Sequence, residues 1–331
     1  MRVFVTQPIA ESALARLRQV AEVEVNSDAS KPIGKQVLCE AVGRAEILYS
    51  LLHDRVDRDV IAANPRLRMI ASMAITPDGI AVAEATARRI PVTVIPPIVG
   101  EATADIAFGL ILAVARRLVE GDRLVRQGIF PGSQSSFLAG AGVCGMVLGL
   151  IGGGGRIGRA VARRARGFGM PVLYWAPRRM PEGEERALEM TYVGFDEVFQ
   201  QSDFVSLHAP LREETRHLVG ARELALMKPS AFLINTARGA VVDEAALIRA
   251  LAERRIAGAG LDVFEHEPLV ERELLAMSNV VLSPHLGSAV AELRETMANI
   301  VVDNILAVLE GRRPPNCVNP EVYARDGASG R

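Results

Sequence analysis

Two separate series of short apolar or β-branched runs, each alternating with stretches of helical spacing, dominate this chain. The first series ends near Ile95 and the second begins at Val147. Strands that alternate with helices form a parallel sheet with helices on its faces, so two series predict two such sheets. The sequence therefore predicts an α/β protein of two doubly wound parallel-sheet domains with a cleft between them. The expected strands are 2–6, 23–25, 47–50, 68–73 and 92–95 in the first series, and 147–152, 172–175, 204–209, 231–237, 256–264 and 279–285 in the second.

Two long stretches of helical spacing mark the borders of the second series. Apolar residues recur every three or four positions over residues 101–127, which predicts one long helix, and residues 290–309 predict another. The tail "GRRPPNCVNPEVY" is expected to run back to the first domain. The first domain is thus predicted to be discontinuous, with residues 1–99 and 290–331, and the second to comprise residues 100–289.

The composition argues against several classes of protein. The 331 residues are enough for two domains with full cores, and 49% hydrophobic and 23% charged residues are ordinary for a globular protein. A net charge of −1 argues against a nucleic-acid or membrane surface as partner. No apolar run is long enough to span a bilayer, and the N-terminus lacks the apolar core of a signal peptide. Cys39, Cys144 and Cys317 are spaced as neither a disulfide framework nor a metal site, so we expect a cytoplasmic protein without a metal.

A glycine-rich turn joins the first strand of the second series to a helix. Gly153, Gly155 and Gly158 match the pattern G-x-G-x-x-G, in which the glycines allow a tight turn, close approach of a pyrophosphate and close helix packing. A register that starts at Gly152 is also open, and a turn without a ligand is the alternative. The predicted nucleotide contacts of this turn are Gly153, Gly155, Arg156, Ile157 and Gly158.

The end of the next strand indicates which dinucleotide is bound. Proteins that prefer NAD(H) usually place an acidic residue there for the ribose hydroxyls, whereas this chain has Ala176 followed by Arg178 and Arg179. Two guanidinium groups offer forked contacts to a 2′-phosphate. The sequence therefore favours NADP(H) as cofactor and leaves NAD(H) possible. A solvated basic turn is the alternative interpretation.

Three blocks in the second half carry a resemblance to a known family. "NTARGAVVDEAAL", "GLDVFEHEP" and "SPHLGSA" are similar to the signature blocks of the D-isomer-specific 2-hydroxyacid dehydrogenases, and the similarity extends over nearly the whole chain. The resemblance implies a flavodoxin-like substrate domain and a Rossmann dinucleotide domain. It also implies that Arg238, Glu267 and His285 are the catalytic residues.

The positions of these three residues favour the same chemistry. Arg238 and Glu267 follow predicted strands and His285 ends one, and the carboxyl ends of parallel strands are where doubly wound sheets bind ligands. Arg238 can hold a carboxylate and polarise a carbonyl oxygen, while His285 beside Glu267 can serve as an acid near neutral pH. Taken singly, the three could be a surface ion pair, a loop charge and a cap.

Further contacts follow from the resemblance alone. Asp262 matches the family aspartate that meets the nicotinamide carboxamide, and Thr103 is expected near the nicotinamide ribose. Arg238 and His285 are expected to contact cofactor as well as substrate. The remaining implied cofactor contacts are His208, Pro210, Thr215, Thr236, Ala237 and Gly287.

The predicted substrate loop departs from the family pattern. Ala74, Ile75 and Thr76 are expected to hold the substrate carboxylate through backbone amides, yet Thr76 replaces a family glycine. Threonine does not readily take the positive φ open to glycine, so a reshaped loop is expected. Ile75 stands where phosphite dehydrogenases carry a lysine, which argues against a phosphite substrate.

These observations together predict an NADP(H)-preferring reductase that converts a small 2-oxoacid to the D-2-hydroxyacid. Glyoxylate, hydroxypyruvate and 2-ketogluconate are the substrates that the resemblance implies. It also implies a homodimer, with residues 121–145 as the expected contact. The alternatives are a dinucleotide-binding regulatory protein of the corepressor type and a phosphite dehydrogenase-like enzyme.

Overall fold

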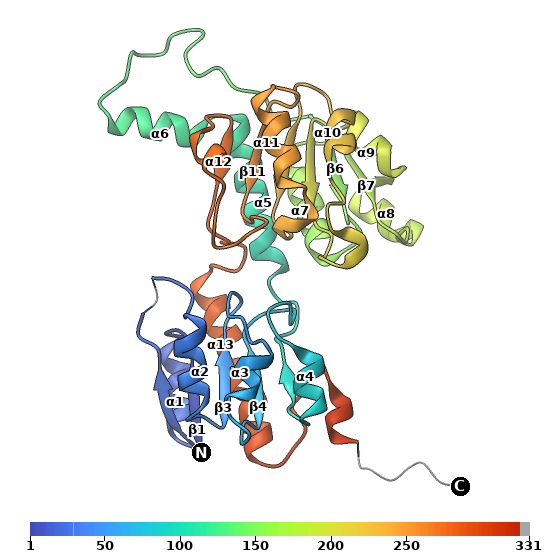
Figure 1. The fold of residues 1–331 in the computed structure, drawn as a ribbon. Helices are drawn as coiled ribbons and strands as arrows, with labels where there is room; N and C mark the ends of the chain where they lie inside the picture. The colour runs from blue at the N-terminus through green and yellow to red at the C-terminus, as the bar shows by residue number, and fades with distance from the viewer. Residues whose placement is uncertain (29, 325–331) are drawn as a thin grey trace. The chain divides into compact units, whose positions relative to one another are not determined.

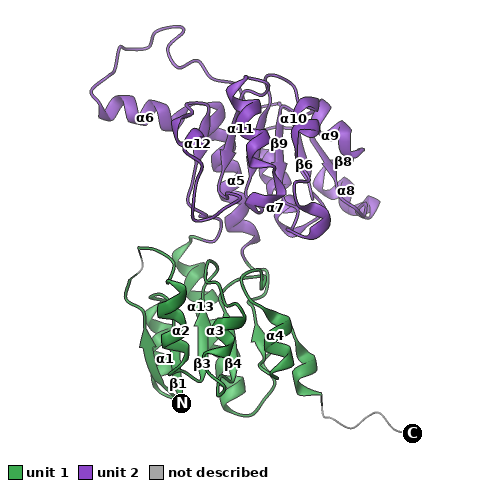
Figure 2. Cartoon of the chain, viewed as in Figure 1, with its two compact units in different colours: residues 1–98, 289–331 green, residues 99–288 purple. Residues whose placement is uncertain are grey.

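The computed structural model describes residues 1–28 and 30–324, which divide into two compact units. Unit 1 comprises Met1–Ile98 and Ala289–Arg331, and unit 2 comprises Val99–Ser288 (Figure 2). Each unit contains one sheet, and all strand pairs in both sheets are parallel. The prediction of two parallel-sheet α/β domains is therefore confirmed.

Unit 1 has the strand order β2-β1-β3-β4-β5, which is the order of flavodoxin-like folds. Its strands are β1 (Arg2–Val5), β2 (Glu22–Val25), β3 (Ile47–Ser50), β4 (Met69–Ser72) and β5 (Val92–Thr93). Its helices are α1 (Glu11–Arg18), α2 (Lys35–Val42), α3 (Arg58–Ala62), α4 (Val82–Ala87) and α13 (Ala291–Leu309) (Figure 1). Helices α2, α3 and α4 pack over the buried side chains of Phe4, Leu48 and Ile70.

The C-terminal tail adds a segment beside β5 in unit 1. Thr93 and Cys317 form an antiparallel bridge, and the Val318 N–H donates to the Val92 carbonyl at 2.9 Å. The Asn319 side chain accepts the Val92 N–H at 2.8 Å and is itself buried. The edge of the sheet is thus covered by the chain that follows α13, which removes an open strand edge.

Unit 2 has the strand order β12-β11-β10-β9-β6-β7-β8, whose six strands from β8 to β11 follow the Rossmann order. The strands are β6 (Leu148–Ile151), β7 (Val172–Trp175), β8 (Met190–Tyr192), β9 (Phe204–Leu207), β10 (Phe232–Asn235), β11 (Gly258–Leu261) and β12 (Val280–Leu282). The helices are α5 (Gly100–Ala115), α6 (Leu118–Arg126), α7 (Arg156–Gly167), α8 (Glu182–Leu188), α9 (Phe195–Gln201), α10 (Ala221–Leu226), α11 (Glu244–Ala252) and α12 (Arg272–Ala276) (Figure 1).

Helices cover both faces of the unit 2 sheet and create two cores. Successive side chains of a strand point to opposite faces. Leu148 and Leu150 of β6 therefore join a core with α5 and α7, whereas Ile151 joins a second core with α9, α10 and α11. Burial on both faces explains why these strands consist of apolar runs rather than alternating residues.

The prediction of one helix over residues 101–127 was wrong. Helix α5 ends at Ala115, α6 begins at Leu118, and Arg117 between them has a left-handed φ of +54°. The N–H of Ala141 donates to the Ala115 carbonyl at 2.8 Å, and a Cβ at Gly140 would overlap that same oxygen. The carbonyl at the end of α5 is therefore hydrogen-bonded to a segment about 25 residues further along the chain. The hydrophobic spacing of residues 101–127 does not reveal this contact.

Cys39, Cys144 and Cys317 are free thiols. Within the described part of the chain, no helix is both long enough and apolar enough to cross a membrane.

Candidate active site

The carboxyl edge of the unit 2 sheet brings the predicted catalytic residues together. Strands β10, β11 and β12 end at Asn235, Leu261 and Leu282, and Arg238, Glu267 and His285 follow them within a few residues. The glycine turn after β6 lies at this same edge. Ligands of doubly wound sheets bind at the carboxyl ends of the strands, so this edge is the candidate active site.

His285 and Glu267 form a hydrogen-bonded pair. The His285 Nδ1 lies 2.9 Å from Glu267 Oε2, and each side chain is 18% exposed. The backbone N–H of Phe264 donates to the other carboxylate oxygen, Oε1, at 2.9 Å, which holds the carboxylate in place. Because Nδ1 faces a carboxylate, Nε2 is the ring nitrogen suited to proton exchange with a substrate.

The loop that carries His285 is held by the buried carboxylate of Asp262. Asp262 is 1% exposed and accepts the N–H groups of Leu286 at 2.7 Å and Gly287 at 2.9 Å. Its Oδ1 also accepts the hydroxyl of Ser283 at 2.5 Å. His285 itself has a φ of +55°, an uncommon conformation for a residue other than glycine. Asp262 thus fixes the backbone of His285, and its contact with nicotinamide stays a prediction.

Thr103 in the first turn of α5 packs against the same loop. Its hydroxyl lies 2.9 Å from the Val99 carbonyl and 3.0 Å from the Gly287 carbonyl. A Cβ at Gly287 would lie 3.3 Å from that hydroxyl oxygen, so the two segments are in close contact. The structure therefore places Thr103 beside the His285 loop, and its expected contact with the nicotinamide ribose stays a prediction.

Arg238 follows β10 in a turn that Asn235 holds. The buried Asn235 side chain donates to the Arg238 carbonyl at 3.1 Å and accepts the Ala237 N–H at 3.0 Å. The next residue, Gly239, packs so closely that a Cβ there would overlap the Phe264 carbonyl group. This backbone contact brings the Arg238 turn against the segment that leads to Glu267. Sequence reasoning missed Asn235 and Gly239, although both lie in the block "NTARGAVVDEAAL".

The glycine turn has the geometry of a phosphate-binding turn. Gly152 has a φ of +83°, and a Cβ at Gly153 would lie 2.6 Å from the Tyr174 Cβ. A Cβ at Gly158 would lie 2.6 Å from the Gly153 Cα, so α7 starts directly against the turn. Among the described residues, no side chain caps α7 at Gly155. An uncapped helix N-terminus with adjoining glycines is suited to bind a pyrophosphate.

Two buried polar atoms lie at the neighbouring strand ends. Within the described residues, neither Thr236 Oγ1 after β10 nor His208 Nδ1 after β9 has a hydrogen-bond partner. Burial lowers the pKa of His208 to about 3, so its ring is neutral, with Nε2 3.0 Å from the Ser206 hydroxyl. Buried polar groups are normally satisfied, so these two atoms fit a ligand with hydrogen-bonding groups. Together with the glycine turn they fit a dinucleotide.

The loop after His208 and the turn after β7 hold the other predicted cofactor contacts. The Thr215 hydroxyl donates to the Pro210 carbonyl at 2.6 Å, which closes the loop between them. In the turn after β7, Ala176 is buried, whereas Arg178 and Arg179 are exposed. The two arginines differ in their surroundings, because Arg179 forms an ion pair with a carboxylate of α8.

The predicted substrate loop lies in unit 1, after β4. The Ala74 N–H donates to the Ser72 hydroxyl at 3.2 Å, and the Thr76 hydroxyl donates to Asp78 at 2.8 Å. Thr76 is not among the residues with positive φ, so its backbone lies outside the left-handed region that favours glycine. Ile75 lies between these two anchored residues.

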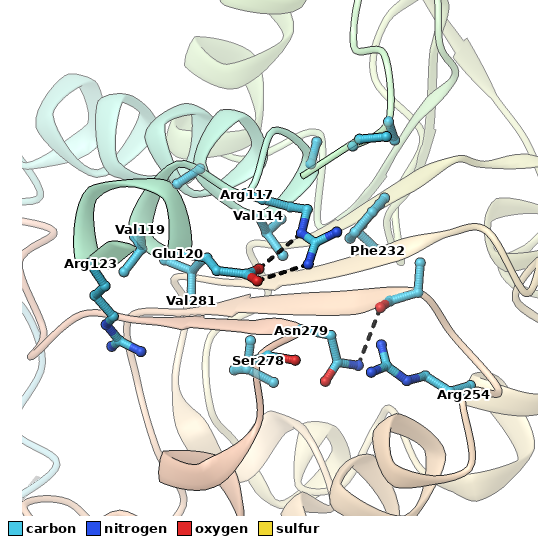
Figure 3. A pocket seen from close by; sticks show the side chains of 17 residues that line it. Val114, Arg117, Val119, Glu120, Arg123, Phe232, Arg254, Ser278, Asn279 and Val281 are labelled. Carbon is cyan, nitrogen blue, oxygen red and sulfur yellow. Dashed lines mark hydrogen bonds and ion pairs between the residues drawn. The ribbon is translucent and has the colours of Figure 1, made fainter. Parts of the chain in front are cut away.

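Unit 2 also contains a cavity of about 360 Å³, which Figure 3 shows from close by. It is lined by Phe232 and Val280, the first residues of β10 and β12, and so it opens at the amino ends of the strands. Arg117 and Glu120 pair at 2.9 Å in its wall. The cavity is therefore distinct from the carboxyl edge that holds Arg238 and His285.

The strand order and the glycine turn define the class of protein. Dinucleotide-dependent dehydrogenases have this arrangement, in which a Rossmann sheet carries a phosphate-binding turn and a histidine–carboxylate pair at one edge. Residues 108–287 match the family model described as "D-isomer specific 2-hydroxyacid dehydrogenase, NAD binding domain". The glyoxylate reductase of Thermococcus litoralis is 47% identical over 325 residues, which cover 97% of each chain. The chain belongs to the D-isomer specific 2-hydroxyacid dehydrogenase family and is an NAD(P)-dependent oxidoreductase.

Solved structures show the same relationship. The TT0316 protein from Thermus thermophilus is 42% identical with a TM-score of 0.87, and the match covers 96% of this chain and 100% of that one. An NADPH-dependent glyoxylate/hydroxypyruvate reductase from Sinorhizobium meliloti, solved with citrate, is 32% identical with a TM-score of 0.79. That match covers 98% of this chain and 99% of the other.

Proposed function

We propose that this protein reduces a small 2-oxoacid to the D-2-hydroxyacid and that it prefers NADPH. The observation that carries the proposal is the pair of His285 Nδ1 and Glu267 Oε2 at 2.9 Å, at the strand edge that also holds the glycine turn. Similar proteins named as glyoxylate or glyoxylate/hydroxypyruvate reductases support a substrate of the glyoxylate or hydroxypyruvate kind, and 2-ketogluconate rests on the family resemblance alone. The absence of an acidic residue at Ala176 supports the cofactor preference.

The chain's own residues divide the work of the reaction. His285 gives its proton from Nε2 to the carbonyl oxygen of the substrate, while Glu267 orients the ring and stabilises its protonated form. Arg238 binds the substrate carboxylate and stabilises negative charge on the carbonyl oxygen. The backbone at residues 74–76 binds the same carboxylate. When bound at this edge, a dihydronicotinamide would supply the hydride for the carbonyl carbon.

The proposed cofactor contacts follow the carboxyl edge of unit 2. Gly153, Gly155 and Gly158, with the amides of Arg156 and Ile157, hold the pyrophosphate. The turn that carries Arg178 and Arg179 receives the ribose end of the cofactor. The remaining proposed contacts are Thr103, His208, Pro210, Thr215, Thr236, Ala237, Arg238, Asp262, His285 and Gly287.

A panel of 2-oxoacids tests the proposal. Purified protein is mixed with NADPH or NADH and each acid, and the fall in dihydronicotinamide absorbance is followed. We expect turnover with at least one of glyoxylate, hydroxypyruvate and 2-ketogluconate, and a higher kcat/KM with NADPH. Tight NADPH binding without turnover of any acid would instead favour the dinucleotide-binding regulatory protein.

We also infer that the protein forms a homodimer through the segment 121–145 and helix α6. Helix α6 buries none of its residues, and Leu118 and Val125 on it are exposed. Phe130 in the following segment is 78% exposed. Large apolar side chains exposed along one segment are typical of interaction surfaces, and a second copy of the chain is the partner that the family resemblance supports.

A further inference from the structure

The turn after β7 contains an arginine that the protein itself binds. Arg179 Nε lies 2.9 Å from Glu185 Oε1, and Nη2 lies 2.7 Å from Oε2, so the guanidinium forms a forked ion pair. The Glu185 side chain on α8 is only 7% exposed. The hydrogen bonds from Arg179 and then from Tyr174 lower the pKa of Glu185 to about 2, so the carboxylate is ionised at neutral pH.

Tyr174 of β7 completes this network. Its hydroxyl donates to Glu185 Oε1 at 2.5 Å and accepts the Met180 N–H at 2.9 Å. The guanidinium carbon of Arg179 lies 5.6 Å from the centre of the Tyr192 ring, within range of a cation–π contact. Both ends of the turn, from the end of β7 to the start of α8, are therefore tied to one carboxylate.

The same helix also reaches the glycine turn. Glu184, next to Glu185, forms an ion pair with Arg159 of α7. The Nε of Arg159 donates to the Gly154 carbonyl at 2.8 Å. Neighbouring carboxylates of α8 thus hold the arginine turn and the phosphate-binding turn at fixed positions in unit 2.

Arg178 differs from Arg179 in its charge balance. Among the residues that the structure describes, Arg178 has no ion-pair partner and is exposed. The charge of Arg179 is balanced by Glu185, and the edge of its guanidinium that best matches a phosphate is already occupied. Arg178 therefore carries the uncompensated positive charge of this turn.

We propose that the two arginines have different tasks in cofactor selection. Arg178 is the specificity-determining residue that contacts the 2′-phosphate, whereas Glu185 and Tyr174 are positioning residues that hold Arg179 and thereby fix the turn. This inference rests on the proposed preference for NADPH. It predicts that substitution of Arg178 weakens binding of the 2′-phosphate alone, whereas substitution of Arg179 lowers stability and weakens nucleotide binding in general.

Binding of 2′,5′-ADP and of ADP, measured by calorimetry, tests the division without any turnover. Arg178→Ala should weaken 2′,5′-ADP at least tenfold, leave ADP within about twofold, and leave Tm unchanged. Arg179→Ala and Glu185→Gln should lower Tm by several degrees and weaken both nucleotides to a similar extent. Arg186→Ala is the matched control, because Arg186 is an exposed arginine of α8 whose ion pair with Glu182 is fully on the surface. Tyr174→Phe provides a milder test of the network if Glu185→Gln does not fold.

Three results would each overturn a part of the inference, and they are distinguishable. Selective loss of 2′,5′-ADP in Arg179→Ala at unchanged Tm, with Arg178→Ala like the wild type, would reverse the assignment while the NADPH preference stands. Equal affinity of the wild type for 2′,5′-ADP and ADP would remove the preference and the role of Arg178 together. Unchanged Tm and nucleotide affinities in Arg179→Ala, Glu185→Gln and Tyr174→Phe would remove the positioning role.

Discussion

The imidazole of His285 is held from two directions, by Glu267 at Nδ1 and by Asp262 through the loop backbone. Both carboxylate oxygens of Asp262 accept hydrogen bonds from this loop, so the buried carboxylate restricts the loop backbone. A ring held in this way needs no reorganisation when it transfers a proton, which is the property that a general acid requires.

His285→Ala should therefore lower kcat by roughly two to four orders of magnitude, the usual contribution of general acid catalysis. The Kd for NADPH should stay within a few-fold, because the ring acts on the substrate oxygen. Steady-state kinetics and a fluorescence titration measure the two quantities. His217→Ala is the matched control, since the His217 side chain is exposed and pairs with Glu265 rather than with a residue of the proposed reaction. Near-normal turnover in His285→Ala would exclude the proposed acid role.

His208 should make stability depend on pH in a defined direction. Its pKa falls from 6.5 to about 3 on burial, so the unfolded chain binds a proton that the folded chain does not. The free energy of unfolding is therefore unaffected by His208 above pH 6.5 and falls as the pH drops from 6.5 toward 3. By pH 5 the loss amounts to about 2 kcal/mol. His208→Gln should therefore lose less stability between pH 7 and pH 5 than the wild type in urea unfolding. An equal loss in both proteins would contradict this assignment.

At the scale of the element, the strand edges depend on close backbone contacts as much as on side chains. The turn after β10 meets the segment after β11 at Gly239, where even a methyl group has no room. This contact is long-range and its cause is the packing of neighbouring strands, since Asn235 pairs in register with Leu261.

Gly239→Ala should destabilise the protein by more than about 3 kcal/mol and reduce turnover, because the backbone must move to accept a Cβ. Gly109→Ala is the matched control, because the same substitution is expected to raise the stability there. Gly109 lies inside α5, and a Cβ added there would have no neighbouring atom within 4 Å, so alanine should stabilise the helix by about 0.5–1 kcal/mol. Thermal and urea unfolding measure both. A wild-type stability in Gly239→Ala would show that the two segments separate easily.

At the scale of the molecule, the exposed apolar segment around α6 makes a specific prediction about assembly. Size-exclusion chromatography with light scattering should give a dimer for the wild type. Val125→Asp and Phe130→Asp should shift it toward the monomer, because each places a charge among apolar side chains. Leu275→Asp is the control, since Leu275 is exposed on α12 outside this segment. A monomeric wild type, or dimers that survive both substitutions, would place any contact elsewhere.

The sequence by itself determined the two parallel sheets, the glycine turn after β6 and the presence of Arg238, Glu267 and His285 at strand ends. These features follow from hydrophobic spacing and turn chemistry, which act over a few residues and are visible in a single stretch of chain. The short edge strand β8 was not predicted, because its three residues are too few to show an alternation of apolar and polar side chains.

Only the tertiary structure decided how these elements are joined. The break at Arg117 depends on a carbonyl taken by Ala141, and the pairing of Arg179 with Glu185 depends on how α8 folds back onto β7. Charge pairing and backbone packing join segments that are adjacent in space, so spacing along the chain does not reveal them. For that reason two adjacent arginines that look equivalent in the sequence have different surroundings in the folded protein.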